Sequence, residues 1–337
     1  MKVSNKFIVA AFLLIANLQA FATIWQVNNI VGVYSNFTSL QAAYNAASSG
    51  DTLYIYGSST GYGDLSMTKP LTLIGPGYYL SQNPQTQSNY TPASINVLYF
   101  RPNSGGSVVM GLTIGQISCK TSNITIRRNM LLNGVQVSDS SLSNNSNIIV
   151  SQNYIAGGCV QTYSGIVSNV TVSNNIIVGC ISLNTGSNYT VLNNYISGTV
   201  YMNNGTFKNN IHSNYNINTG STSSTFTNTV VQNNVFSGRT LSNGSVEIAI
   251  DTPANKINFT SLSLVFTQTG SNDGKYQLKT GSPAIGFAYG GGDCGPFGSG
   301  SPYILSGMPN IPSVYEFIVP PAGGSNLSIT IKAKSHQ

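Results

Sequence analysis

The chain has 337 residues, of which 41% are hydrophobic and only 7% are charged, where about 25% charged is usual for soluble domains. The hydrophobic fraction argues against disorder. The 14 Lys and Arg against 8 Asp and Glu include no basic run, which argues against a nucleic-acid partner. We therefore expect a surface covered by uncharged polar side chains and Tyr.

The beginning of the chain has the pattern of an export signal. Lys2 and Lys6 form a basic start before the apolar run FIVAAFLLIANL, and Ala20-Phe21-Ala22 is a small-x-small cleavage site. The run is too short for a membrane span, and no second long apolar stretch exists. We expect residues 1–22 to be a signal peptide and the mature protein to be secreted, periplasmic or at a cell surface, without a transmembrane segment.

The stretch FTSLQAAYNAASSGD predicts a short helix that covers the open end of the fold. Thr38 and Gln41 have the spacing of a capping box, and Gly50 is expected to stop the helix. Apolar residues at helical spacing make one face: Leu40, Ala43, Tyr44 and Ala47. The runs DTLYIYG and KPLTLIGPG then predict the first coils.

The middle of the chain repeats a motif, seen in ITIRRNMLLNG, IIVSQNYIAGGC, VTVSNNIIVGC and YTVLNNYISGT. Each copy has an Asn between two short apolar stretches that alternate with period two, which predicts a strand, a tight bend and a second strand. Successive Asn residues are 16 to 24 positions apart, so one copy forms one coil with a loop of variable length. Coils stacked about 4.8 Å apart make a parallel β-helix.

The repeated Asn residues predict a structural ladder: Asn129, Asn153, Asn175, Asn194, Asn210 and Asn234. Asn tolerates the left-handed backbone region that a sharp bend requires. Stacked Asn side chains can bond to one another and to the bend, and a buried amide left unpaired costs about 1–3 kcal/mol. The ladder is therefore interpreted as architecture and not as a ligand site.

The coil pattern is expected to continue to residue 290, giving a β-helix over residues 23–290 and a separate tail over 291–337. GGGDCGPFGSGSP has the composition of a loop. YEFIV and LSITIKA flank PPAGGSN and predict a small terminal hairpin.

With these segments the sequence resembles the right-handed parallel β-helix proteins of the pectate-lyase-like superfamily. The resemblance rests on SLQAAYNAASSGDTLYIY, KPLTLIGPG, the coil motif and the late segment YQLKTGSPAIG, and it covers roughly residues 37–290. The whole chain is also similar to secreted bacterial β-helix proteins of unassigned activity. A shared fold of this kind says little about function.

The resemblance implies a working face on the strands that follow the longest loop of each coil. Alternation points eight polar residues outward there: Gln136, Ser138, Gln161, Tyr163, Ser182, Asn184, Tyr201 and Asn203. The resemblance also implies acidic calcium ligands with a cationic base for a lyase, or a carboxylate pair for a hydrolase. Only Asp139 borders this face, and Arg127 or Arg128 would have to be the base. Glu247 and Asp251 would stand about 13 Å apart on one strand, too far for a glycosidase pair at roughly 5–9.5 Å.

Cysteine and histidine add no cofactor or metal site. Cys159 and Cys180 occupy nearly the same place in adjacent coils, where a disulfide and stacked free thiols are both compatible with the spacing. His212 falls on a core position, which predicts either a satisfied core histidine or a locally broken coil. Two His residues alone do not make a metal site.

We therefore expect a secreted or surface-associated β-helix that binds extracellular polysaccharide without catalysis, with no cofactor and no metal. The expected site is Gln136, Gln161, Tyr163, Ser182, Asn184, Tyr201 and Asn203. Tyr163 and Tyr201 would stack on sugar rings two coil steps apart, about 9–10 Å along the solenoid axis. The alternative is a lyase or hydrolase acting on pectin-like or other acidic glycans. An ice-binding surface would need a regular Thr array, and these outward positions are too mixed for one.

Overall fold

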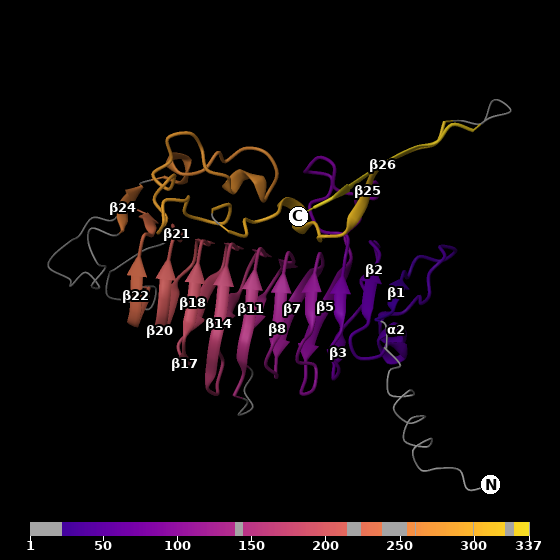
Figure 1. The fold of residues 1–337 in the computed structure, drawn as a ribbon, viewed down its shortest axis with the longest axis horizontal. Coiled ribbons are helices and arrows are strands. Elements are labelled where there is room, and N and C mark those ends of the chain that lie inside the picture. Colours follow the sequence, from indigo (N-terminus) through magenta and orange to yellow (C-terminus); the bar gives the residue numbers. More distant parts are fainter. Residues whose placement is uncertain are drawn as a thin grey trace, which may run out of the picture.

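The computed structural model describes residues 22–138, 144–213, 224–237, 255–259, 261–298, 300–320 and 327–336. Within them the chain winds into a parallel β-solenoid whose 24 strands form one continuous hydrogen-bonded ladder (Figure 1). The all-β parallel architecture expected from the repeats is confirmed. The expected signal peptide lies outside the described residues except for Ala22. None of the described helices is long and apolar enough to cross a membrane.

Each coil contributes to three faces, and we name them A, B and C. Face A is made by strands that pair in one parallel row, and those from β8 onward lead up to the repeated Asn. The strands are β1 (Ile24–Val27), β2 (Thr52–Ile55), β4 (Thr72–Ile74), β6 (Val108–Met110), β8 (Ile124–Arg127), β11 (Ser146–Ser151), β14 (Val167–Ser173), β18 (Tyr189–Leu192) and the second halves of β20 (Val200–Lys208) and β22 (Thr225–Gln232). The two-residue strand β17 (Gly186–Ser187) pairs with the start of β14.

Face B follows the repeated Asn and consists of short strands: β9 (Met130–Leu131), β12 (Tyr154–Ile155), β15 (Ile176–Ile177), β19 (Tyr195–Ile196), β21 (Ile211–His212), β23 (Val235–Ser237) and β24 (Lys256–Phe259). Face C completes the coil: β3 (Leu65–Met67), β5 (Ser94–Phe100), β7 (Thr113–Cys119), β10 (Gly134–Gln136), β13 (Cys159–Gln161), β16 (Cys180–Leu183) and the first halves of β20 and β22.

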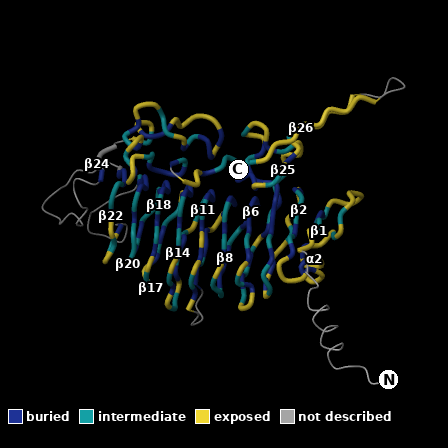
Figure 2. The backbone as a smooth tube through the Cα atoms, in the orientation of Figure 1, coloured by how far each residue is buried: buried dark blue, intermediate teal, exposed yellow. Residues whose placement is uncertain are grey.

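The core inside the coils is built from the residues that the period-two pattern points inward. Ile126, Val150 and Val172 pair in register on face A and are fully buried. Leu131, Ile155 and other residues two positions after each repeated Asn fill the core from face B. Figure 2 shows buried residues alternating with half-buried ones along the strands. Each coil therefore buries apolar surface against the coils on either side, which is how a solenoid gains stability.

The N-terminal end is closed by α2 (Leu40–Ala46), which contacts β1 and β2. All four residues expected on its apolar face are buried. The helix is capped by Ser39, whose Oγ accepts from the N–H of Ala42 at 3.4 Å, so the expected capping-box role of Thr38 is wrong. Asp51 fastens the cap by accepting from the indole N–H of Trp25 at 2.9 Å and the N–H of Ser48 at 2.8 Å.

The repeated Asn residues form a buried ladder that extends one coil further than expected, to Asn255. In each rung, Oδ1 accepts from the backbone N–H of the previous Asn, as Asn175 does from Asn153 at 2.8 Å. Nδ2 donates to a carbonyl one coil back, as Asn175 does to Val150 at 2.9 Å. The left-handed residue at the bend is not the ladder Asn but the residue before it: Arg128, Gln152, Asn174, Asn193, Asn209 and Asn233, with φ between 53° and 58°.

Residues 261–311 leave the solenoid and run back along the outside of face B, and we call this segment the strap. Figure 1 shows it, orange to yellow, along the ends of the face A strands. The last solenoid strand is β24, so this segment includes part of the sequence expected to form coils up to residue 290. The strap covers a second hydrophobic cluster, which includes Tyr154, Tyr195 and Ile211 from face B and Phe266 and Tyr276 from the strap.

Side chains of the left-handed bend residues hold the strap. Gln152 Nε2 donates to the carbonyl of Pro302 at 2.6 Å, and Asn174 Nδ2 donates to the carbonyl of Gly298 at 2.9 Å. Other bend residues bond to strap groups in order along the solenoid. In each pair made of a bend residue and the ladder Asn that follows it, the bend residue therefore binds the strap and the Asn belongs to the ladder.

Replacing Asn174 by Ala is expected to destabilise the fold by about 1 kcal/mol more than replacing it by Gly. Both changes remove the bonds to Pro296 and Gly298. Only Ala also meets the cost of a left-handed conformation, about 1–2 kcal/mol, partly offset by the entropy that Gly loses on folding. Denaturant unfolding of both variants measures the difference, and equal losses would contradict the assignment of strain to this bend.

The chain ends in an antiparallel hairpin of β25 (Pro312–Ile318) and β26 (Thr330–Ser335), as the sequence predicts. Lys332 Nζ and Glu316 Oε1 are 2.8 Å apart across the two strands. Ser313 Oγ donates to the carbonyl of Thr86 at 2.8 Å, which fixes the base of the hairpin near the N-terminal coils.

Candidate functional site

Face C brings four of the expected binding residues into one column. Strand pairing places Gln136 beside Gln161, Gln161 beside Ser182, and Ser182 beside Tyr201. The register continues to Ser118 and Tyr99 in the N-terminal coils, but Ser118 is buried, so the outward column consists of Gln136, Gln161, Ser182 and Tyr201. Their inward neighbours, such as Val160 and Ile181, are fully buried, so alternation turns the column outward. The column holds amide, hydroxyl and phenol groups and no charge.

A second group of expected residues follows the ends of the face C strands. Thr162 Oγ1 bonds to Asn184 Oδ1 at 3.0 Å, and Asn203 Nδ2 donates to the carbonyl of Asn184 at 3.0 Å. Tyr163 is 65% exposed. Ser138 was expected to point outward with Gln136 but is fully buried, because its Oγ accepts from the backbone N–H of Tyr163 at 3.0 Å after strand β10 has ended.

The two Tyr residues expected to form a sugar-binding line do not share a column. Tyr201 is in register with Ser182 and through it with Gln161, whereas Tyr163 lies two residues beyond Gln161. A line from one to the other therefore crosses the face diagonally and does not follow the solenoid axis. The expected alignment of Val160, Ile181 and Val200 is the one observed. The sugar-binding line was wrong because Tyr201 directly follows Val200, whereas Tyr163 lies three residues after Val160.

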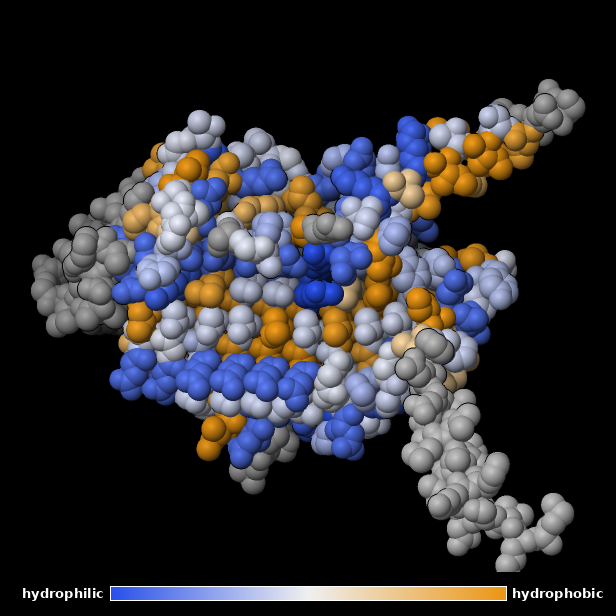
Figure 3. Space-filling model, viewed as in Figure 1, coloured by the Kyte–Doolittle hydropathy of each residue, from blue (hydrophilic) through white to orange (hydrophobic). Residues whose placement is uncertain are grey.

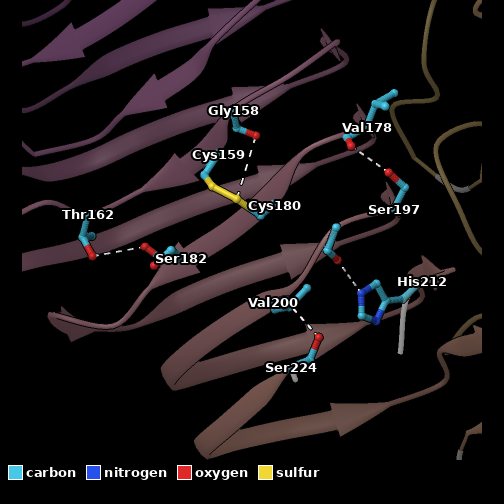
Figure 4. The surroundings of a disulfide bond; sticks show 11 residues. Gly158, Cys159, Thr162, Val178, Cys180, Ser182, Ser197, Val200, His212 and Ser224 are labelled. Carbon is cyan, nitrogen blue, oxygen red and sulfur yellow. Dashed lines mark hydrogen bonds between the residues drawn. A yellow bond between two sulfur atoms is a disulfide. The ribbon is translucent and has the colours of Figure 1, made fainter. Parts of the chain in front are cut away.

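Cys159 and Cys180 form a disulfide at the beginning of strands β13 and β16 (Figure 4). The two residues are direct partners in the ladder, with Cα atoms 4.4 Å apart. Cys119 and Cys294 are buried and take no part in this disulfide. Cys294 Sγ donates to the carbonyl of Asn233 at 3.1 Å, and burial raises the pKa of Cys119 well above its usual range. The disulfide adds a covalent link between adjacent coils beside the polar column.

The described carboxylates are dispersed. Asp51 fastens the cap, and Glu316 pairs with Lys332 in the hairpin. Asp64 accepts from Asn96 Nδ2 at 2.8 Å, and Asp293 accepts from the N–H of Gly286 at 2.8 Å. Among the described residues no three His, Cys, Asp or Glu side chains gather as metal ligands. Asp139, Glu247 and Asp251 lie outside the described residues.

The two Arg residues considered as a lyase base do not lie on face C. Arg127 ends strand β8 on face A, and its Nη2 is 3.4 Å from Asn310 Oδ1. Arg128 is a bend residue that donates to Gln152 Oε1 at 2.9 Å and to the carbonyl of Met308 at 3.0 Å. Burial, with the nearby charge of Arg127, lowers the pKa of Arg128. Its guanidinium is used to hold the strap.

His212 is a fully buried core residue between Ile196 and Phe236 in the face B ladder. Its Nε2 is 2.7 Å from the carbonyl oxygen of Gly198. Burial lowers its pKa to about 4, although the bond to Gly198 acts in the opposite direction. The ring is therefore neutral at physiological pH and packs as part of the core.

A buried polar cluster under the strap was missed by the sequence reasoning. Asp273 has no exposed surface and accepts from the N–H of Ser306 at 2.6 Å and from Asn83 Nδ2 at 3.0 Å. The hydroxyls of Tyr78 and Tyr303 are 2.6 Å apart, and that of Tyr303 is 3.3 Å from Asp273 Oδ2. Burial raises the pKa of both phenols well above their usual range. The cluster ties the strap to the loop after β4.

Two hollows open beside this cluster and the hairpin. One has a volume of about 360 Å³ and is lined in part by Gln85, Tyr303 and His336. The other has a volume of about 300 Å³, with Tyr54, Tyr56 and several polar loop residues in its wall. Both are within the size range of small-molecule sites. They lie between segments far apart in the sequence, so no local motif could have indicated them.

No protein-family model matches the chain, and neither a curated protein nor a solved structure matches it.

Proposed function

We propose that this protein is a secreted or surface-associated β-helix that binds a neutral extracellular polysaccharide on face C without catalysis. The observation that supports the proposal is the uncharged outward column of Gln136, Gln161, Ser182 and Tyr201, one residue per coil. Amides and hydroxyls at fixed spacing suit the hydroxyls of a sugar chain. From the resemblance of its sequence, we also propose that the protein is a member of the pectate-lyase-like superfamily.

Tyr163 is the proposed principal contact. Its ring is largely exposed next to the column, and an aromatic ring offers a flat apolar surface to a sugar face. Tyr201 lies diagonally across the face, so we propose that the glycan crosses several coils obliquely. Asn184 and Asn203, which bond to each other, follow Ser182 and Tyr201 by two residues, as Tyr163 follows Gln161, and so lie beside this path on the side of Tyr163.

Replacing Tyr163 by Ala is expected to lower glycan affinity about fivefold, because a stacking contact is worth about 1 kcal/mol. Tyr201→Ala is expected to have a smaller effect, because that residue is less exposed. Affinity electrophoresis against a panel of neutral and acidic polysaccharides provides the measurement. Tyr34→Ala is a matched control, because Tyr34 is 86% exposed and lies outside face C.

Salt is expected to change this binding little, because screening acts on charge pairs and the column carries none. Steep salt dependence would remove face C from consideration, as would glycan binding that survives the double substitution of Tyr163 and Tyr201. Release of unsaturated products or new reducing ends would instead favour the enzymatic alternative.

A further inference from the structure

Face A carries a second regular surface, separate from the proposed glycan site. One outward register position is β-branched in all ten strands of face A: Ile24, Thr52, Thr72, Val108, Thr125, Ile149, Thr171, Thr190, Thr206 and Val230. We call this the β-branched column. All of its members are half-buried or exposed. A single residue class at one position of every coil makes a straight row of methyl and hydroxyl groups.

An exposed row of Asn runs beside this column over the last six coils. Its members have left-handed backbone conformations at the bend between faces C and A: Asn123, Asn147, Asn169, Asn188, Asn204 and Asn228. Three of the five neighbouring pairs bond directly: Asn147 Nδ2 to Asn123 Oδ1 at 3.0 Å, Asn169 Nδ2 to Asn147 Oδ1 at 3.3 Å and Asn228 Nδ2 to Asn204 Oδ1 at 3.3 Å. Figure 3 shows a straight hydrophilic row across this face. We call it the outer Asn row.

The two rows form a two-dimensional lattice. Coils repeat about 4.8 Å apart, and residues two positions apart on a strand are about 6.7 Å apart. Figure 1 shows the strands from β8 to β22 side by side with nearly the same direction, so both rows run straight across the strands. Branching at Cβ restricts χ1, and five of the six Asn side chains bond to a neighbouring Asn of the row. The array is therefore ordered before it meets a ligand, which lowers the entropic cost of binding.

We propose that face A binds the surface of ice. Neither row contains a charged side chain, so the array matches an uncharged ligand whose own repeat lies close to the coil spacing, as the water positions in ice do. Methyl groups of Thr, Ile and Val order adjacent water, while Thr hydroxyls and Asn amides bond to it. A glycan is the weaker fit, because neither row offers an aromatic ring for stacking, whereas face C offers Tyr163 and Tyr201.

The four triplets of the form Asn-x-Thr on this face also follow from the geometry. In Asn123-Ile124-Thr125 the first residue makes the left-handed bend, the second points into the core and the third joins the β-branched column. The same assignment holds at Asn169 and Asn188, and at Asn204 the first and third residues have the same roles, with Gly205 between them. Each triplet therefore contributes its Asn to the outer Asn row and its Thr to the β-branched column.

The test is partition of the purified protein into slowly growing ice from dilute solution. We expect several-fold enrichment in the ice fraction over a non-binding protein of similar size. Thr171→Lys with Thr190→Lys, in the middle of the array, should abolish the enrichment. Gln161→Lys with Ser182→Lys places the same charges on face C of the corresponding coils and should leave it unchanged.

Thermal unfolding checks that both double variants remain folded, and Thr171→Gln, which breaks the plane without adding charge, replaces the Lys variant if it does not fold. Absence of enrichment for the unmodified protein would overturn the proposal, as would an equal loss in the face C variant. Sedimentation of the same samples tests whether face A instead binds a second copy of the chain. A dimer that dissociates on substitution of Thr171 and Thr190, without ice enrichment, would assign face A to that contact and overturn the proposal.

Discussion

Replacing Asn175 by Ala is expected to lower the free energy of unfolding by about 2–6 kcal/mol, because two buried groups lose partners at about 1–3 kcal/mol each. The N–H of Asn153 loses its acceptor at 2.8 Å, and the carbonyl of Val150 loses a donor at 2.9 Å. Asn175 has no exposed surface, so water cannot replace either bond without opening the coil. Urea unfolding followed by circular dichroism measures the change.

Asn203→Ala is the matched control for this experiment. Asn203 Nδ2 makes one exposed bond, to the carbonyl of Asn184 at 3.0 Å, and surface substitutions of this kind usually change stability by about 0.5 kcal/mol or less. A loss at Asn175 no larger than the loss at Asn203 would show that the ladder is not a main source of stability.

Acid is expected to destabilise the protein through His212. Its pKa is about 4 in the folded protein against 6.5 for the ordinary group, so the unfolded chain binds a proton in this range and the folded chain does not. Stability is therefore fully present above pH 6.5, falls as the pH is lowered toward 4, and loses about 3 kcal/mol over that window.

His212→Leu should remove most of this pH dependence, because Leu does not titrate and fits a core position. The measurement is the difference between the unfolding free energies at pH 7.5 and pH 4.5. Burial also lowers the pKa of His336, in the hairpin, so His336→Ala is the control and should retain most of the dependence. An unchanged pH dependence in His212→Leu would show that other groups govern acid unfolding.

The solenoid could be predicted because its cause is local. Alternating apolar residues around each repeated Asn specify which side of each strand points inward, and those residues are buried in the structure. The ladder was followed only to Asn234, although Asn255 lies 21 positions further on, within the spacing of the other rungs. The motif between them is interrupted, which hid the last rung.

The strap could not be predicted in the same way because it has no periodicity. Its binding partners were visible, however, since a polar residue precedes each ladder Asn from Asn129 to Asn234, and aromatic residues such as Tyr154 and Tyr195 follow the Asn on face B. A polar row and an aromatic row on the outside of a filled core indicate that another segment covers them. The array on face A was missed for a different reason: the search for Thr was confined to the face that the resemblance implied.

The position of the hairpin has a mechanical consequence. Tyr54 of β2 and Val314 of β25 line the same hollow, and β2 pairs with β1, so the first and last strands lie at one end of the solenoid. Tension applied between these strands would load the hairpin, the first coils and the bond between Ser313 and Thr86. The coils from β8 to β24 would carry none of that load. A protein pulled in this way would hold most of its length unstretched, with its lateral faces still in register.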